Sequence, residues 1–174
     1  MTATSPVLSD GVVTLRAPDD RDLDAIDAGI HDADVVHWLG QPEGTAADVL
    51  ERNRLRAADG SPTFAICAGV DDCVGHIWLN RDPSDRAAGA IGYWLLPTVR
   101  GRGYATRAVR LLAEHSLREL GMRRLRLVTE PDNLRSQGVA ERAGFHRGET
   151  RPAHGEIDGR SIDVIVFALP LEET

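Results

Sequence analysis

Two kinds of hydrophobic pattern follow one another along the chain. Short runs alternate apolar with polar residues or are rich in β-branched residues, as is typical of strands, and longer runs place an apolar residue at every third or fourth position, as is typical of amphipathic helices. We expect strands at residues 12–16, 64–68, 73–79, 90–96, 125–129 and 162–167, and a further one near 145–147 that pairs with the last.

Helix-start and helix-stop residues delimit the helical segments. Pro18 and the acidic pair Asp19-Asp20 favour the start of a helix, because acids stabilise a helix N-terminus. Gly121 is a suitable end for the longest one. We expect a helix that carries Leu23, Ile26 and Ile30, a second at residues 45–57, a third at 105–120 with Ala105, Ala108, Val109, Leu112, Ser116, Leu117 and Leu120 on one face, and a short one that ends at Ala143.

The order of these elements predicts a fold of the α+β class. The strands at 64–68, 73–79 and 90–96 follow one another through short polar connections, as in an antiparallel meander. Together with the remaining strands and helices, they predict a single mixed, mostly antiparallel twisted sheet of about six to seven strands with helices on both faces. With no linker or repeat in the sequence, we assign residues 1–174 to one domain.

Charge and composition narrow the classes of function. The formal net charge of -7 disfavours a nucleic-acid partner, which would call for a basic face. It suits a cationic substrate, and equally a surface that only keeps the protein soluble.

No apolar run is long enough to cross a bilayer and residues 1–10 lack the layout of a secretory signal, so we expect a cytoplasmic protein without a membrane partner. The two cysteines, Cys67 and Cys73, lack the setting of a zinc site or a disulfide framework, so we expect free thiols and no metal.

The segment from Arg100 to Ala105 lies where the chain leaves a strand and enters the longest helix. Its glycines let backbone N–H groups approach an anion, and the helix N-terminus adds partial positive charge. Such a turn suits a pyrophosphate. The dinucleotide fingerprint and the P-loop are both excluded by spacing, since the third glycine of the first and the Gly-Lys-Ser/Thr of the second are absent.

The pattern Arg/Gln-x-x-Gly-x-Gly/Ala, met by Arg100, Gly103 and Ala105, resembles the acetyl-CoA signature of the GNAT N-acetyltransferases. The flanking segments at 92–97, 133–136 and 143–145 resemble that superfamily too, over roughly residues 12–169. Within it the chain is most similar to the RimJ/RimL type of ribosomal-protein N-terminal acetyltransferase, a likeness that residues 159–163 support.

This resemblance implies a cofactor site for acetyl-CoA. Backbone groups of the strand would contact the pantetheine arm and the thioester, the turn would wrap the pyrophosphate, and an asparagine would bind the arm or cap the following helix. The implied residues are Tyr93, Trp94 and Leu95 in the strand, Arg100, Gly101, Arg102, Gly103, Tyr104, Ala105 and Thr106 in the turn, and Asn133 after the next strand.

The sequence identifies the catalytic groups less clearly than the residues of the cofactor site. Many GNAT enzymes carry a tyrosine that protonates the leaving thiolate, and here Ala140 stands in its place. The resemblance to RimL implies Ser136 as the acid, although a hydroxyl there also suits a helix start. It implies a glutamate before the last strand as the base, for which Glu156 is the candidate, and Glu130 is a second. His37, Trp38, His76 and Trp78 are candidates for an acceptor pocket.

We therefore expect an acyltransferase, a monomer or homodimer, that moves the acetyl group of acetyl-CoA to a primary amine by direct attack in a ternary complex. The acceptor is expected to be a protein N-terminal α-amine or a small cationic amine. The alternative is a catalytically silent acyl-CoA-binding domain that acts as a sensor or partner module.

Overall fold

The computed structural model describes residues 5–69 and 71–170. The helices are η1 (Asp20–Asp22), α1 (Leu23–Ile30), α2 (Ala33–Leu39), α3 (Ala46–Ala58), η2 (Pro97–Val99), α4 (Tyr104–Arg118) and α5 (Leu134–Arg142), where η marks a 3-10 helix. The strands are β1 (Leu8–Ser9), β2 (Val13–Arg16), β3 (Thr63–Ala68), β4 (Asp72–Arg81), β5 (Ala88–Leu95), β6 (Arg124–Thr129), β7 (His146–Ile157) and β8 (Arg160–Pro170). Each element expected from the sequence is present, and all but β7 have their ends within a few residues of the expected positions.

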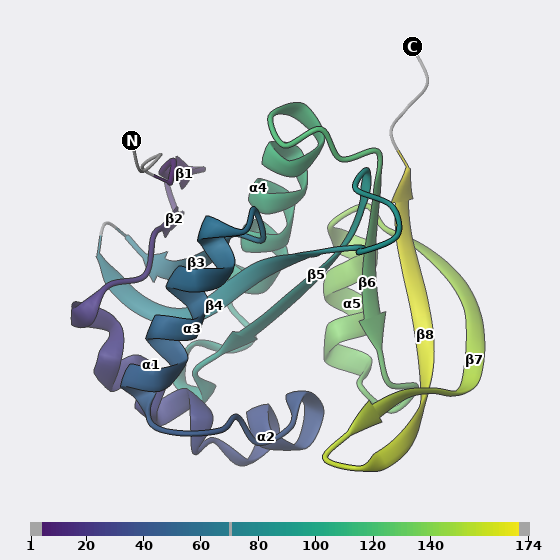
Figure 1. Ribbon diagram of the computed structural model, residues 1–174, viewed down its shortest axis with the longest axis horizontal. Helices are drawn as coiled ribbons and strands as arrows, with labels where there is room; N and C mark the ends of the chain where they lie inside the picture. The colour runs from purple at the N-terminus through teal and green to yellow at the C-terminus, as the bar shows by residue number, and fades with distance from the viewer. Residues whose placement is uncertain (1–4, 70, 171–174) are drawn as a thin grey trace.

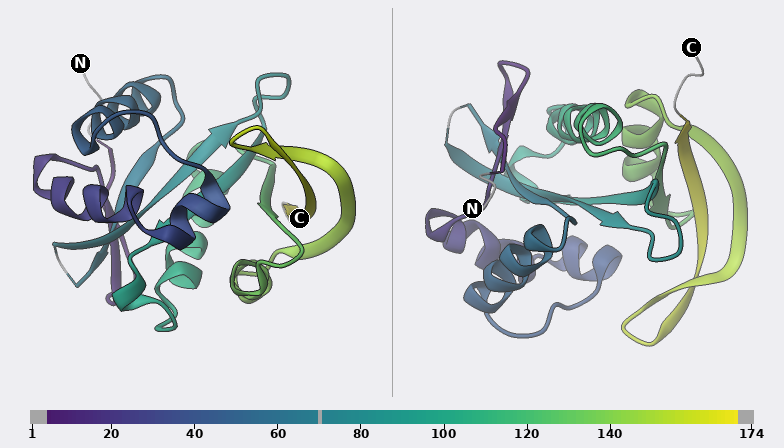
Figure 2. Two further views of the ribbon diagram at one scale, coloured as in Figure 1. Left: turned by 90° about the horizontal axis from the view of Figure 1, so that it is seen from below. Right: turned by 45° about the horizontal axis from the view of Figure 1, so that its top comes forward.

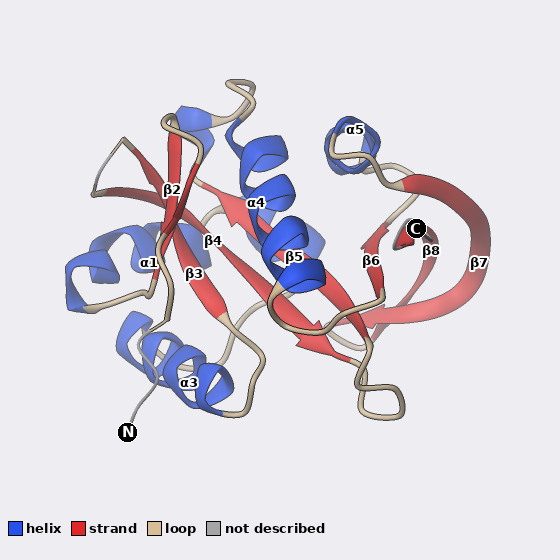
Figure 3. Cartoon of the chain, turned by 90° about the horizontal axis from the view of Figure 1, so that it is seen from above, coloured by secondary structure: helices blue, strands red, loops and turns tan. Residues whose placement is uncertain are grey.

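All of these strands belong to one twisted sheet (Figures 1 and 3). Their order is β1-β2-β3-β4-β5-β6-β8-β7, and every neighbouring pair is antiparallel except β5 with β6, which is parallel. The mixed, mostly antiparallel sheet is confirmed, with eight strands rather than six or seven. The assignment of residues 1–174 to one domain stays a prediction.

Helices cover both faces of the sheet, as expected. α4 and α5 lie on one face and α1 to α3 on the other (Figure 2, right). The main core forms between α4 and the sheet and includes Phe64, Ile77, Leu112 and Phe167. A smaller core joins α1 to α3 through apolar residues such as Leu50.

Two of the helical segments begin with the capping chemistry that their sequences indicate. Asp19 caps η1 and Asp22 returns a bond to the Asp19 backbone, while Thr45 and Asp48 form the same reciprocal box at the start of α3. Such boxes satisfy N–H groups that have no partner within a helix. The acidic opening after Pro18 therefore produces a short 3-10 turn that leads into α1.

Four elements differ from expectation. β1, α2 and η2 were not predicted, and β7 runs for 12 residues although its sequence indicated a strand only near its start. β7 is an edge strand whose residues are almost all exposed. Its sequence therefore lacks the alternation that a half-buried strand shows.

Within the described ranges, no helix combines the length and the apolar composition that crossing a bilayer requires.

Candidate functional site

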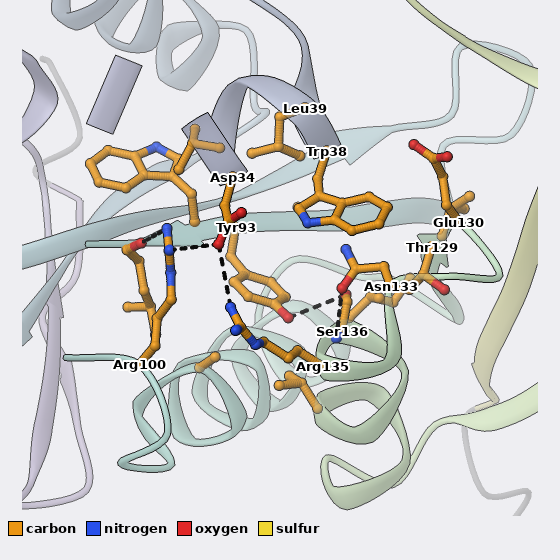
Figure 4. A pocket seen from close by; sticks show the side chains of 18 of the residues that line it. Asp34, Trp38, Leu39, Tyr93, Arg100, Thr129, Glu130, Asn133, Arg135 and Ser136 are labelled. Atoms are coloured by element: carbon orange, nitrogen blue, oxygen red, sulfur yellow. Dashed lines mark hydrogen bonds and ion pairs between the residues drawn. The ribbon is translucent and has the colours of Figure 1, made fainter. Parts of the chain in front are cut away.

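The parallel strands β5 and β6 separate from one another halfway along. They pair only from Ala88–Ala90 to Arg124–Arg126, although β5 stays paired with β4, and β6 with β8, to their ends. The wedge between them opens into a cavity of about 820 Å³ (Figure 4). In the described part of the chain, backbone groups of β5 beyond Ala90 therefore border the cavity and have no partner strand on that side.

The glycine turn forms one end of the cavity. Gly101 and Gly103 have φ angles of +79° and +80°, a conformation that residues with a Cβ rarely adopt, and a Cβ on either would meet no atom within 4 Å. Gly103 is the N-cap of α4 and gives that helix no side-chain cap. Thr106, in the first turn, has a buried hydroxyl oxygen without a hydrogen-bond partner among residues 5–69 and 71–170. Free N–H groups, open space and an unsatisfied hydroxyl at a helix N-terminus fit a pyrophosphate.

Arg100, the first arginine of the turn, forms ion pairs with α2. The guanidinium of Arg100 contacts Asp32 over 2.6 Å and Asp34 over 3.0 Å, both from the N-terminal end of α2, and donates to the carbonyl oxygen of Leu95 over 2.9 Å. Its charge is thus directed to α2 and not to the turn. Burial works against ionisation of Asp32, but the bonds from Arg100 and from backbone N–H groups outweigh it and lower the pKa of Asp32.

Most of the other residues of the turn line the cavity. Tyr104, Ala105 and Thr106 line the cavity together with both glycines, whereas the exposed Arg102 does not. The structure thus places every predicted turn residue except Arg102 at the cavity.

Neighbouring side chains of β5 point to opposite faces of the sheet. The Tyr93 phenol donates to the Ser136 hydroxyl oxygen over 3.2 Å on the α5 side. Trp94 stacks on His76, with 5.3 Å between ring centroids, and packs against Gly29 of α1, where a Cβ would come within 2.6 Å of the indole. Leu95 is buried in the main core and also borders the cavity.

Asn133 and Ser136 lie together at the start of α5. Asn133 is the N-cap of this helix, and its side-chain oxygen accepts a bond from the Ser136 backbone N–H over 3.1 Å. Both residues also line the cavity. Asn133 therefore caps α5 through its side-chain oxygen, and its side-chain amide nitrogen lies on the cavity side (Figure 4).

The other end of the cavity is mostly apolar and was largely missed by the sequence analysis. α2 contributes Trp38 and Leu39, β6 contributes Val128, and the β7–β8 hairpin contributes Ile157 and Ile162. These residues come from segments far apart in the chain, so no local motif marks them.

The C-terminal end of α2 is joined to the hairpin turn. The backbone N–H of Gln41 donates to both carboxylate oxygens of Asp158, over 3.2 and 3.0 Å. This link lies where α2 and the hairpin approach each other at the bottom of Figure 1. Of the four proposed acceptor-pocket residues only Trp38 lines the cavity; His37 is exposed, and His76 and Trp78 lie outside it.

The two candidate bases have different surroundings. Glu156 is exposed and is not part of the cavity lining, whereas its neighbour Ile157 is. The reason is the strand period of two, which turns adjacent side chains to opposite faces. The assignment of Glu156 as the base stays a prediction that this position does not favour. Glu130 follows β6, lines the cavity, and is only 14% exposed. Its carboxylate contacts the Arg160 guanidinium over 3.3 Å.

A second polar cluster lies away from the cavity. Ligand atoms of Asp22, Cys73 and His76 lie within 4.8 Å of one another. Both oxygens of Asp22 already accept from the Arg16 guanidinium, over 2.7 and 2.9 Å, so the chain itself supplies the cation there. Cys67 and Cys73 are free thiols, and burial raises the pKa of Cys73 to about 12.

Comparisons with known proteins identify the family of the chain. A family model described as "Acetyltransferase (GNAT) domain" matches residues 13–146. A "Probable N-acetyltransferase YjcK" of Bacillus subtilis is 37% identical over 129 residues, 73% of this chain and 71% of the relative. The "Ribosomal-protein-serine acetyltransferase" of Escherichia coli is 36% identical over 106 residues, 60% of this chain and 59% of the relative.

The fold has solved counterparts as well. "RimL- Ribosomal L7/L12 alpha-N-protein acetyltransferase in complex with Coenzyme A" superposes with a TM-score of 0.83 at 22% identity, covering 96% of this chain and 99% of the other. With the family match, these findings confirm the resemblance read from the turn. The chain belongs to the GNAT acetyltransferase family and is an N-acetyltransferase whose acyl donor is acetyl-CoA.

Proposed function

We propose that this enzyme acetylates a primary amine, either a protein N-terminal α-amine or a small cationic amine, by direct attack in a ternary complex. The observation that carries the proposal is the wedge between β5 and β6, which gives one cavity two unlike ends. The end at the glycine turn suits a pyrophosphate, and the end between α2 and the hairpin is free for an acceptor. A cytoplasmic location and a monomeric or homodimeric state belong to the same proposal.

On the donor side, the N–H groups of the turn from Gly101 to Thr106 hold the pyrophosphate, and the Thr106 hydroxyl gains the partner that it lacks. Backbone groups of β5 from Tyr93 to Leu95 and the Asn133 amide hold the arm. Bound acetyl-CoA supplies the acyl group as a thioester. An N–H of β5 next to the thioester carbonyl stabilises negative charge on its oxygen.

On the acceptor side, we propose Glu130 in place of Glu156 as the group that receives the proton of the amine. An amine must be neutral to attack, and Glu130 is the glutamate in the cavity lining. The Arg160 guanidinium, 3.3 Å away, orients the Glu130 carboxylate at the edge of the cavity. The apolar side chains Trp38, Leu39 and Ile157 cover the carbon next to the amine.

At the leaving group, Ser136 donates a hydrogen bond to the departing sulfur. A thiol has a pKa of about 8.5, so its thiolate is a tolerable leaving group near neutrality and a single hydroxyl is sufficient help. Ser136 is therefore expected to be useful but not indispensable.

The test is a thiol-release assay with acetyl-CoA over a panel of peptides with free N-termini, polyamines and aminoglycosides, with N-acetylated peptides as controls. The chain contains no lysine, so acetylation of its own lysine side chains cannot be mistaken for turnover. Amine-dependent thiol release, with the acetylated product found by mass spectrometry, supports the proposal. Tight binding of acetyl-CoA without amine-dependent release from any acceptor would instead support the silent acyl-CoA-binding alternative.

A further inference from the structure

Two hydroxyl groups from separate elements meet inside the cavity. Tyr93 lies near the end of β5, and Ser136 lies in the first turn of α5, 43 residues later. The phenol donates to the serine oxygen over 3.2 Å (Figure 4), and both residues line the cavity. The hydrogen bond therefore joins β5 to α5 across the wedge between β5 and β6.

The direction of this bond decides where the proton of Ser136 can go. A hydroxyl offers one donor and two acceptor positions. A serine within a helix often donates to the carbonyl four residues earlier, as Ser116 of α4 does to Leu112 over 2.6 Å. The Ser136 hydroxyl has no such bond among the described residues; its oxygen accepts from Tyr93. Its own proton is left free to donate into the cavity.

We propose that Tyr93 is a positioning residue for Ser136, because its phenol holds the serine hydroxyl in the orientation that directs the serine proton toward the leaving sulfur. The inference rests on the proposed function, in which Ser136 donates to that sulfur. No bond to Tyr93 forms or breaks in the reaction. The phenol occupies one acceptor position of the serine oxygen and excludes rotamers that turn the hydroxyl away.

The surroundings keep this arrangement fixed. The backbone of Ser136 is held separately, because its N–H donates to Asn133 over 3.1 Å. Burial raises the pKa of the Tyr93 phenol, so the phenol keeps its proton and remains a donor at neutral pH. A serine whose backbone and side chain are both fixed loses little orientational freedom when the leaving group is bound.

The experiment compares Tyr93→Phe, Ser136→Ala and the double variant. Tyr93→Phe keeps the ring and removes only the hydroxyl. We expect it to lower kcat by about tenfold, the effect of about one hydrogen bond, while KM for acetyl-CoA changes by less than about twofold. Added to Ser136→Ala, Tyr93→Phe should cause no further loss, since the serine through which it acts is gone. Circular dichroism and urea midpoints confirm that each variant is folded.

Two outcomes would overturn the inference. An unchanged kcat in Tyr93→Phe shows that the phenol does not assist, and an equal loss in the presence and absence of Ser136 shows that it does not act through the serine. Failure of the proposed function looks different, because the wild-type protein would then release no thiol with any amine.

Discussion

The guanidinium of Arg100 lies 2.6 Å from the carboxylate of Asp32, and this pair joins the glycine turn to the start of α2. Asp32 caps α2 through the same carboxylate, which accepts from the Val35 N–H over 3.1 Å. The first residue of the glycine turn therefore holds the helix that supplies one wall of the cavity.

We predict that Arg100→Ala lowers the free energy of unfolding by about 1–3 kcal/mol, since it leaves a mostly buried carboxylate without its cation. The two side chains are 21% and 16% exposed. Arg118→Ala is the matched control, because Arg118 is 73% exposed and, among the described residues, pairs only with Glu114 in its own helix. Its removal should cost less than about 1 kcal/mol. Urea denaturation measures both, and equal losses would contradict a structural role for Arg100.

Gly103→Val is predicted to weaken acetyl-CoA binding by at least about tenfold. The new side chain would occupy the space beside the turn and would force a β-branched residue into the left-handed region. Gly121→Val is the control, since Gly121 has φ +70° and equally open surroundings at the far end of α4, outside the cavity lining. Both variants carry backbone strain, and only Gly103→Val should lose affinity in calorimetry. The same affinity in both would argue against the turn as the pyrophosphate site.

Glu130→Gln is predicted to lower kcat/KM for the amine by about 10²–10⁴-fold, the typical contribution of a general base. It should leave the affinity for acetyl-CoA nearly unchanged. Glu156→Gln, which changes an exposed side chain outside the cavity, should behave as the wild type. If steady-state kinetics instead show the loss in Glu156→Gln alone, the assignment of the base from this geometry is wrong.

Stability is predicted to fall as the pH drops from about 6.5 to 4 because of His76. Burial lowers its pKa from 6.5 to about 4, with Asp22 and Arg16 as the charges that face it. Between these pH values the histidine is protonated in the unfolded chain but stays neutral in the folded chain. The free energy of unfolding therefore decreases, by about 3 kcal/mol at pH 4. Asp22 and Asp32, whose pKa values are lowered from 3.8, add their loss only below this pH range.

His76→Gln should flatten the pH dependence of stability between pH 6.5 and 4 in urea denaturation. His31→Gln, which replaces a histidine with a side chain 69% exposed, should keep the wild-type slope. A slope that is the same in His76→Gln and the wild type would assign the acid sensitivity to other groups.

Several elements were missed by the sequence analysis for physical reasons. β1 is two residues long and exists through its pairing with β2. α2 is seven residues long, too short for a helical period to stand out, and is held by the Asp32 cap and the Arg100 bridge. β7 takes its strand conformation from pairing with β8, because its own residues are exposed.

The position of Glu156 shows how register decides a site. The pairing of β7 with β8 shifts at two places, between Arg147 and Thr150 and between Arg151 and Gly155. A shift of one residue turns a strand side chain to the other face. These irregularities depend on the partner strand, so counting along the sequence could not tell Glu156 from Ile157.

The class of fold, the glycine turn before α4 and, through this turn, the family could be predicted from the amino-acid sequence alone. These features depend on residues close together in the chain, such as the backbone freedom of Gly101 and Gly103 beside a helix start. The set of side chains that share the cavity depends instead on the tertiary structure. The folded chain directs Arg100 to Asp32, brings Tyr93 to Ser136, and places Glu130 rather than Glu156 in the cavity lining. Each of these contacts joins segments that are distant in sequence, and its geometry follows from where β5 and β6 separate, which no local pattern records.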